Sequence, residues 1–98
     1  MGNGLKSANF LIESRLRDAA RGDIAACYDL GMAYSTGTAG VTFDLVEAHK
    51  WFNLAAMTGD ATAQAARAEI AGDMSAREIA AAQRAARDWL VLNRARAA

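Results

Sequence analysis

The chain has 98 residues, a formal net charge of zero at pH 7, and a composition that is 53% hydrophobic and 22% charged. That length fits one small domain, and the apolar content is ordinary for a globular protein. No apolar run approaches the roughly 20 residues of a membrane span. The first residues lack the apolar stretch of a secretory signal, so we expect a cytoplasmic protein. The single cysteine excludes an intramolecular disulfide and a cysteine-rich zinc site.

Alanine supplies 25 residues and proline none, which favours closely packed, uninterrupted helices. The dipeptide Gly-Asp occurs at 22–23, 59–60 and 72–73, and the first two copies lie 37 residues apart, as in an internal repeat. Glycine ends many helices in the left-handed conformation, and aspartate caps the next helix. These signals predict helices at about residues 9–21, 23–35, 44–58, 60–71 and 75–97. Residues 1–8 lack such a pattern and are predicted to form a flexible tail.

Two helix starts have the spacing of a capping box, in which two side chains each accept from the other residue's backbone N–H. Ser75 and Glu78 form the stronger example, and Asp44 and Glu47 the weaker one. The short connections make neighbouring helices antiparallel, and paired helices at a fixed repeat are typical of an α-solenoid. The alternative is a globular three-helix bundle followed by a helical hairpin.

One stretch resembles a known repeat. Residues 26–34 contain Ala, then Leu-Gly, then Tyr, and residues 37–44 contain two glycines, Val and a final Asp. The next helix carries Ala48, Trp51, Phe52, Ala55, Ala56 and Gly59. This pattern resembles a Sel1-like repeat, a relative of the TPR solenoids. The similarity weakens beyond it, since Arg67 stands where Leu30 does and Ala71 where Tyr34 does.

The resemblance implies an all-α, right-handed α-solenoid of about five antiparallel helices. It places a diverged N-terminal helix at 9–22, a full repeat at 23–59, a partial repeat at 60–72 and a long capping helix at 74–98, like the closing helix of short bacterial members. Gly31 costs about 1 kcal/mol inside a helix, which indicates close approach by Trp51 or Phe52 of the facing helix. Trp89 is expected to cover the open end. Met1 and the terminal cap together suggest a whole protein.

Residues suited to catalysis are few. Cys27 and His49 are the only pair that could form a Cys–His couple, and we interpret Cys27 as a buried core residue and His49 as a partly exposed flank. The aspartates at helix starts are expected to cap them. Residues 75–98 carry five arginines against two acids, which fits a solvated face better than a nucleic-acid site. We therefore expect neither an enzyme nor a cofactor or metal, and no nucleic-acid or membrane partner.

Surface recognition is the remaining function. By analogy with Sel1-like solenoids, the first helix of each repeat lines a concave face, where Tyr28 and Met32 would be apolar anchors with Asp29, Thr62 and Glu69 beside them. The sequence thus favours a non-catalytic protein–protein interaction module that binds a peptide or helix. A homo-oligomeric building block is the first alternative, because fewer than two full repeats leave an open end. A small ligand-binding protein or enzyme using Cys27 and His49 is the second.

Overall fold

The computed structural model describes residues 3–97, which form five α-helices. These are α1 (Asn3–Ala20), α2 (Ile24–Thr36), α3 (Leu45–Ala56), α4 (Ala61–Ala71) and α5 (Ala76–Ala97). Helix α3 packs against α2, α4 and α5, whereas α1 packs mainly against α2. The all-α class and the long C-terminal helix are as predicted. The radius of gyration of 13.3 Å is the value expected of a compact domain of this length.

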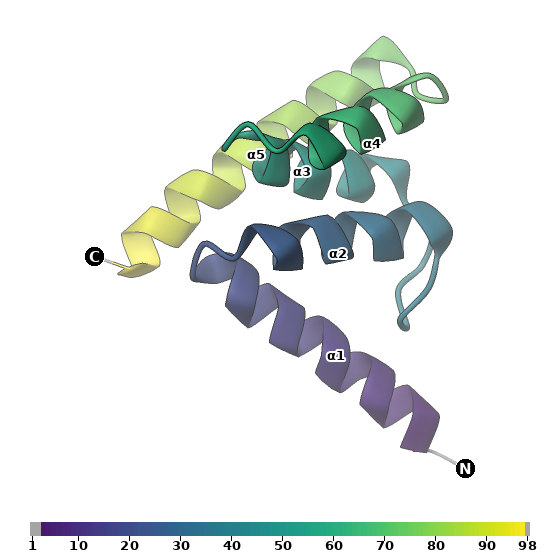
Figure 1. Ribbon diagram of the computed structural model, residues 1–98, viewed down its shortest axis with the longest axis vertical. Helices are drawn as coiled ribbons and strands as arrows, with labels where there is room; N and C mark the ends of the chain where they lie inside the picture. Colours follow the sequence, from purple (N-terminus) through teal and green to yellow (C-terminus); the bar gives the residue numbers. More distant parts are fainter. Residues whose placement is uncertain (1–2, 98) are drawn as a thin grey trace.

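Figure 1 shows how the two ends of the chain are arranged. Helix α1 diverges from the other helices toward its N-terminus, and α5 runs alongside α3 until its C-terminal part reaches the turn between α1 and α2. A hydrogen bond fixes this meeting point, because the side-chain amide of Asn93 donates to the carbonyl oxygen of Ala20 at 2.9 Å. The C-terminal helix is therefore held against both the centre and the beginning of the fold.

The first helix starts at Asn3 rather than near Asn9, so residues 3–8 of the predicted tail are helical. Residues 1 and 2 of that tail lie outside the described residues. The sequence offers a physical reason, since Leu5, Lys6 and Ala8 all favour helix and no proline interrupts them. Helix propensity alone can thus account for the extension of α1 over residues 3–8, which lack the hydrophobic pattern used to predict the other helices.

The Gly-Asp dipeptides end helices in two different ways. Gly22 and Gly59 have φ angles of 93° and 88°, the left-handed conformation that was predicted. Gly72 instead has a φ of −62°, so that prediction was wrong for the third copy. Its N–H donates to Glu69 O, and the next two N–H groups also reach back three residues, which tightens the last turn. A right-handed turn of this kind needs no glycine.

Aspartates cap three helices, as predicted. Asp23, Asp44 and Asp60 accept hydrogen bonds from backbone N–H groups in the first turns of α2, α3 and α4 at 3.1–3.3 Å. The α5 capping box is complete, since Ser75 Oγ accepts from Glu78 N at 3.1 Å and Glu78 Oε1 accepts from Ser75 N at 2.8 Å.

The second expected box, at Asp44 and Glu47, is only half formed. Asp44 accepts from the N–H of Glu47, but its own N–H donates to Tyr34 O at 3.0 Å. The Glu47 carboxylate pairs with Lys50 at 3.3 Å instead. The reciprocal hydrogen bond does not form, because a carbonyl oxygen in the last turn of α2 already accepts from the N–H of Asp44.

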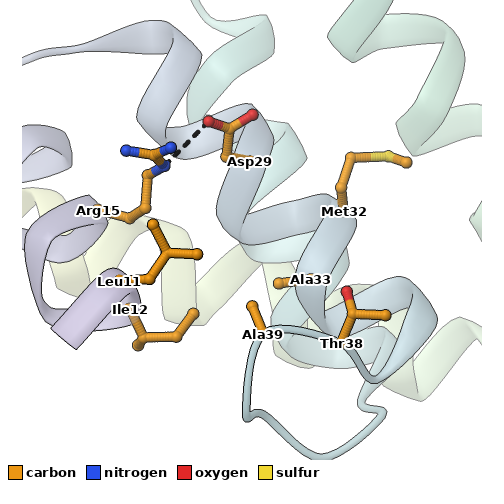
Figure 2. Close-up of a pocket in the computed structure, with 8 residues that line it drawn as sticks. All are labelled: Leu11, Ile12, Arg15, Asp29, Met32, Ala33, Thr38 and Ala39. Carbon is orange, nitrogen blue, oxygen red and sulfur yellow. Dashed lines mark ion pairs between the residues drawn. The ribbon is translucent and has the colours of Figure 1, made fainter. Parts of the chain in front are cut away.

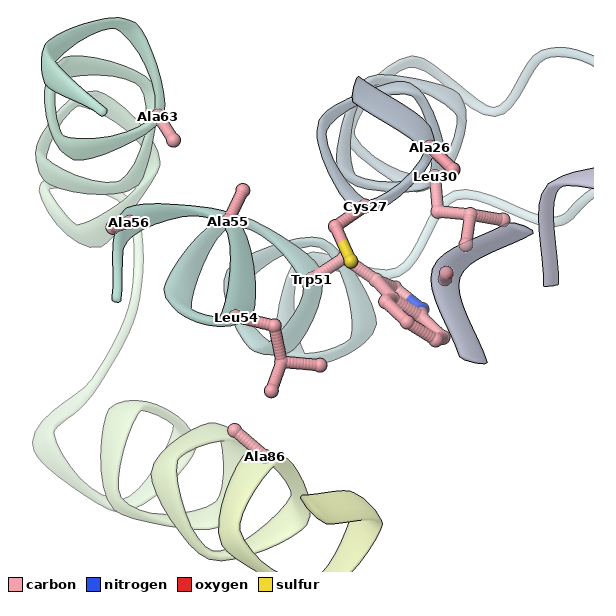
Figure 3. Packing of buried hydrophobic residues seen from close by; sticks show 10 residues of the cluster. Ala26, Cys27, Leu30, Trp51, Leu54, Ala55, Ala56, Ala63 and Ala86 are labelled. Atoms are coloured by element: carbon pink, nitrogen blue, oxygen red, sulfur yellow. The ribbon is translucent and has the colours of Figure 1, made fainter. Parts of the chain in front are cut away.

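The core is built from alanines around three large, fully buried side chains, Leu30, Trp51 and Phe52. Figure 3 shows Leu30 and Trp51 among the alanines that surround them. A Cβ at Gly31 would lie 2.5 Å from two ring carbons of Phe52, which confirms the close approach and identifies its partner. Trp51 instead contacts Trp89 of α5, with ring centroids 5.4 Å apart and the planes at 71°. Trp89 therefore packs against the central helix.

Candidate functional site

Met32 is the exposed apolar side chain around which the candidate site is built. It lies on α2 and is 40% exposed. Two grooves share it. The α1–α2 groove has a volume of about 300 Å³, and the α2–α4 groove about 240 Å³. Met32 thus forms a ridge with a hollow on each side.

The α1–α2 groove lies between two helices and a loop (Figure 2). Its lining consists of Leu11, Ile12 and Arg15 from α1, Asp29, Met32 and Ala33 from α2, and Thr38 and Ala39 from the loop. Arg15 Nε and Asp29 Oδ2 are 3.0 Å apart, and both side chains are more than a third exposed. An exposed pair of this kind is worth only about 0–1 kcal/mol, so an incoming charged group can replace either member.

The loop that closes this groove has an unusual backbone. Gly37 and Gly40 have φ angles of 68° and 84°, and Ala39 between them has 57°. A left-handed alanine is strained, and strain of this kind costs about 1–3 kcal/mol. Hydrogen bonds from Thr38 N to Ala33 O and from Val41 N to Thr38 O hold the turn in place. The loop wall of the groove is therefore fixed by the backbone.

The α2–α4 groove has an apolar floor and a polar edge. Phe52 of α3 lies in its lining together with Met32, Ser35 and Thr36 of α2 and Ala66, Glu69 and Ile70 of α4. Ser35 Oγ and Thr36 Oγ1 both donate to the carbonyl oxygen of Met32, at 3.0 and 2.8 Å. These hydroxyl protons are therefore used within the helix. Glu69 is the one charged residue in the lining of this groove.

Of the five residues predicted to bind a partner, three line the grooves and two do not. Asp29 and Glu69 each line one groove, and Met32 lines both. Tyr28 is half-buried, with its ring centroid 5.5 Å from that of Phe52, and lines neither groove. Thr62 is exposed in the first turn of α4, where its N–H donates to Asp60, and it also lines neither.

Sequence reasoning missed the contribution of α1 and of the loop. Nothing in the sequence placed Leu11 or Arg15 beside α2. The pairing of Arg15 with Asp29 depends on how α1 crosses α2, and helix periodicity alone does not fix that crossing.

Cys27 is a buried residue, as expected. It is 4% exposed, and burial together with the nearby carboxylate of Asp23 raises the pKa of its thiol to about 11. The thiol therefore stays protonated at neutral pH, which makes it a poor nucleophile.

His49 was predicted to be partly exposed, and this was wrong. The side chain is 3% exposed because α3 has neighbours on several sides. Burial, and secondarily the charge of Arg67, lower the pKa of its imidazole, and its Nδ1 atom has no hydrogen-bond partner in the described part of the chain. His49 is therefore a neutral core residue at pH 7.

Within residues 3–97, no group of three or more His, Cys, Asp or Glu side chains is arranged to hold a metal ion. None of the helices described is both long enough and apolar enough to cross a membrane. No family model, curated protein or solved structure matches the chain. Its function must therefore be inferred from its own residues.

Proposed function

We propose that this protein is a non-catalytic interaction module that binds a peptide or helix of a partner protein across Met32 and its two grooves. The observation that carries the proposal is a 40% exposed methionine between two hollows. Methionine is flexible and polarizable, and it is favoured at surfaces that adapt to a partner. A partner helix with apolar residues at successive turns would place one in each groove.

The size of the grooves favours this kind of partner over an enclosed small molecule. Sites for small molecules usually have volumes of about 300–1,000 Å³. The α1–α2 groove, at about 300 Å³, is at the lower limit of that range and the α2–α4 groove, at about 240 Å³, is below it, so each suits a single side chain. Asp29 on one side and Glu69 on the other would attract basic residues of the partner.

The proposal extends to the family: one intact Sel1-like repeat with flanking cap-like helices, in a right-handed solenoid. Two observations support it. Gly31 lies close to the ring of Phe52. The glycines that follow α1 and α3, Gly22 and Gly59, are both left-handed and are 37 residues apart in the sequence. In that family α2 and α4 would line the concave face, and the α2–α4 groove would be the central part of that face.

A selection experiment tests the binding surface directly. A displayed library of random helical peptides is selected on the purified protein, and the enriched peptides are titrated against variants. The variant Met32→Glu combined with Asp29→Lys should weaken binding by at least about tenfold, the loss expected when a central anchor is removed. Circular dichroism should show unchanged helicity, because both side chains are exposed.

Thr62→Glu is the matched control, since it adds a carboxylate to an exposed site outside both grooves. Its position in the first turn of α4 tolerates an acidic residue. Equal affinity of all three proteins would refute the assignment of the grooves. Enrichment of no peptide at all would refute the interaction module itself.

Self-association is the second candidate, and a separate observation favours it. Five large apolar side chains are each at least 58% exposed, and a second copy of the chain could cover some of them: Phe10, Phe43, Met57, Val91 and Leu92. Light scattering over a range of concentrations separates the two candidates, since a constant dimer mass favours the building block and a constant monomer mass excludes it.

A further inference from the structure

A third hollow in the molecule is lined by basic residues. Its volume is about 340 Å³, and it lies where the C-terminal parts of α1 and α5 meet. The lining residues, which we call the basic pocket, are Arg17, Ala20, Arg21, Asn93 and Arg96. None of them lines either groove beside Met32, so the basic pocket is independent of the proposed interaction surface.

One hydrogen bond joins the two helices that form the basic pocket. Asn93 Nδ2 donates to the carbonyl oxygen of Ala20, the last residue of α1. One turn earlier on α5, Trp89 and Leu90 pack against the hydrophobic core. Arg17 and Arg21 are four residues apart and share one face of α1, while Arg96 follows Asn93 by one turn.

The arginines of the basic pocket form no ion pair with another residue in the described part of the chain. The ion pairs among the described residues are Arg15–Asp29 and Lys50–Glu47, and neither involves an arginine of the basic pocket. The C-terminus of a helix carries roughly half a negative charge. Two such ends therefore offset about one positive charge, whereas the residues that line the pocket include three arginines and no acid. Three arginines in one hollow are more than the charge of these two helix ends accounts for.

A phosphate group suits a hollow lined by three arginines. It carries about −1.5 to −2 at pH 7, and guanidinium groups bind its oxygens in a bidentate manner. The Asn93 amide has a second N–H available in addition to the one bonded to Ala20. We infer that the basic pocket binds a dianionic phosphate, either free or as the terminal monoester of a small molecule.

Nuclear magnetic resonance titration tests this inference. The ¹⁵N-labelled full chain is titrated at pH 7.5 and constant ionic strength with inorganic phosphate and, separately, with O-phosphoserine. The side-chain N–H signals of Arg17, Arg21, Arg96 and Asn93 should shift together and saturate. Arg21→Gln and Arg96→Gln should each weaken binding by about tenfold, as expected for the loss of a charge-assisted contact. Tighter binding of O-phosphoserine identifies the monoester as the ligand, and tighter binding of inorganic phosphate identifies the free ion.

Arg84→Gln is the matched control, because Arg84 is an exposed arginine of α5 that does not line the pocket. It should leave the phosphate affinity unchanged. The inference is overturned if no saturation is seen, if Arg84→Gln weakens binding as much as Arg21→Gln, or if the dicarboxylate succinate binds as tightly as phosphate. Tighter binding of an oligonucleotide without terminal phosphates would also overturn it, and would identify a nucleic-acid backbone as the ligand.

Discussion

Helices α3 and α1 are stabilised in different ways. In α3 seven of twelve residues are buried, among them Trp51, Phe52 and Leu54. In the part of α1 whose side chains are described, residues 10–20, Ala19 alone is buried, and Phe10, Leu11 and Leu16 are exposed. Packing stabilises α3, whereas α1 depends more on helix propensity and on its contacts with α2. The binding surfaces proposed above lie at the edges of the packed centre, and α1 contributes to two of the three hollows.

The largest difference between the two helices should appear when one phenylalanine of each is truncated. Phe52→Ala removes a fully buried ring and should lower the free energy of unfolding by about 3–5 kcal/mol. Phe10→Ala removes a ring that is 65% exposed and should change it by less than about 0.5 kcal/mol. Urea unfolding measures both variants. Similar losses would show that α1 is as firmly packed as α3.

The glycines offer a second test, with opposite signs expected at two positions. Gly31→Ala places a methyl group 2.5 Å from the Phe52 ring, and the clash should outweigh the gain in helix propensity, for a net loss of about 1–2 kcal/mol. Gly72→Ala should instead stabilise by about 0.4–1 kcal/mol, because its φ is −62° and the nearest atom lies at 3.4 Å. Thermal unfolding of both variants checks the signs. A stabilised Gly31→Ala would mean that Phe52 moves away freely.

His49 allows the packing around α3 to be tested by pH. Its pKa is lowered in the folded protein, so the folded state binds the proton less readily than the unfolded state. The contribution of neutral His49 to the free energy of unfolding is therefore fully present above the ordinary histidine pKa of about 6.5. It decreases as the pH falls from there toward the pKa of His49 in the folded protein. His49→Leu should flatten the curve between pH 8 and pH 5. An unchanged curve would assign this pH dependence to other groups.

The smallest effect is expected at the ion pair between α1 and α2. Arg15→Ala should cost no more than about 1 kcal/mol, because both partners are exposed. Hydrogen exchange should nevertheless speed up in α1, whose amides are expected to open at lower free energy than those of α3. Unchanged exchange in α1 would show that this pair does not hold the helix in place.

The sequence was most informative about features that depend on neighbouring residues. The number of helices, the aspartate caps and the Ser75–Glu78 box follow from side chains within one turn of each other. The contact at Gly31 was also predictable, since a glycine inside a helix indicates a close neighbour. Gly72 shows the limit of such reasoning, because the same dipeptide adopted a right-handed turn there.

Features that depend on the crossing of helices were not predictable. Neither the Arg15–Asp29 pair nor the presence of Arg21 and Arg96 in the lining of one hollow can be read from the periodicity of one helix. The burial of His49 has the same origin, since it depends on how closely neighbouring helices pack around α3. The candidate grooves were therefore predicted in part, through Asp29, Met32 and Glu69, and the basic pocket was not predicted.

The alanine-rich core has a consequence for how the protein can change shape. Nine of the fourteen buried hydrophobic side chains in the described part are alanines, and alanine has no rotamers to lose or to exchange. Adaptation to a ligand or partner cannot come from repacking such a core. Within the core it has to come from shifts of whole helices against one another, whereas at the surface the Met32 side chain can still adjust to a partner.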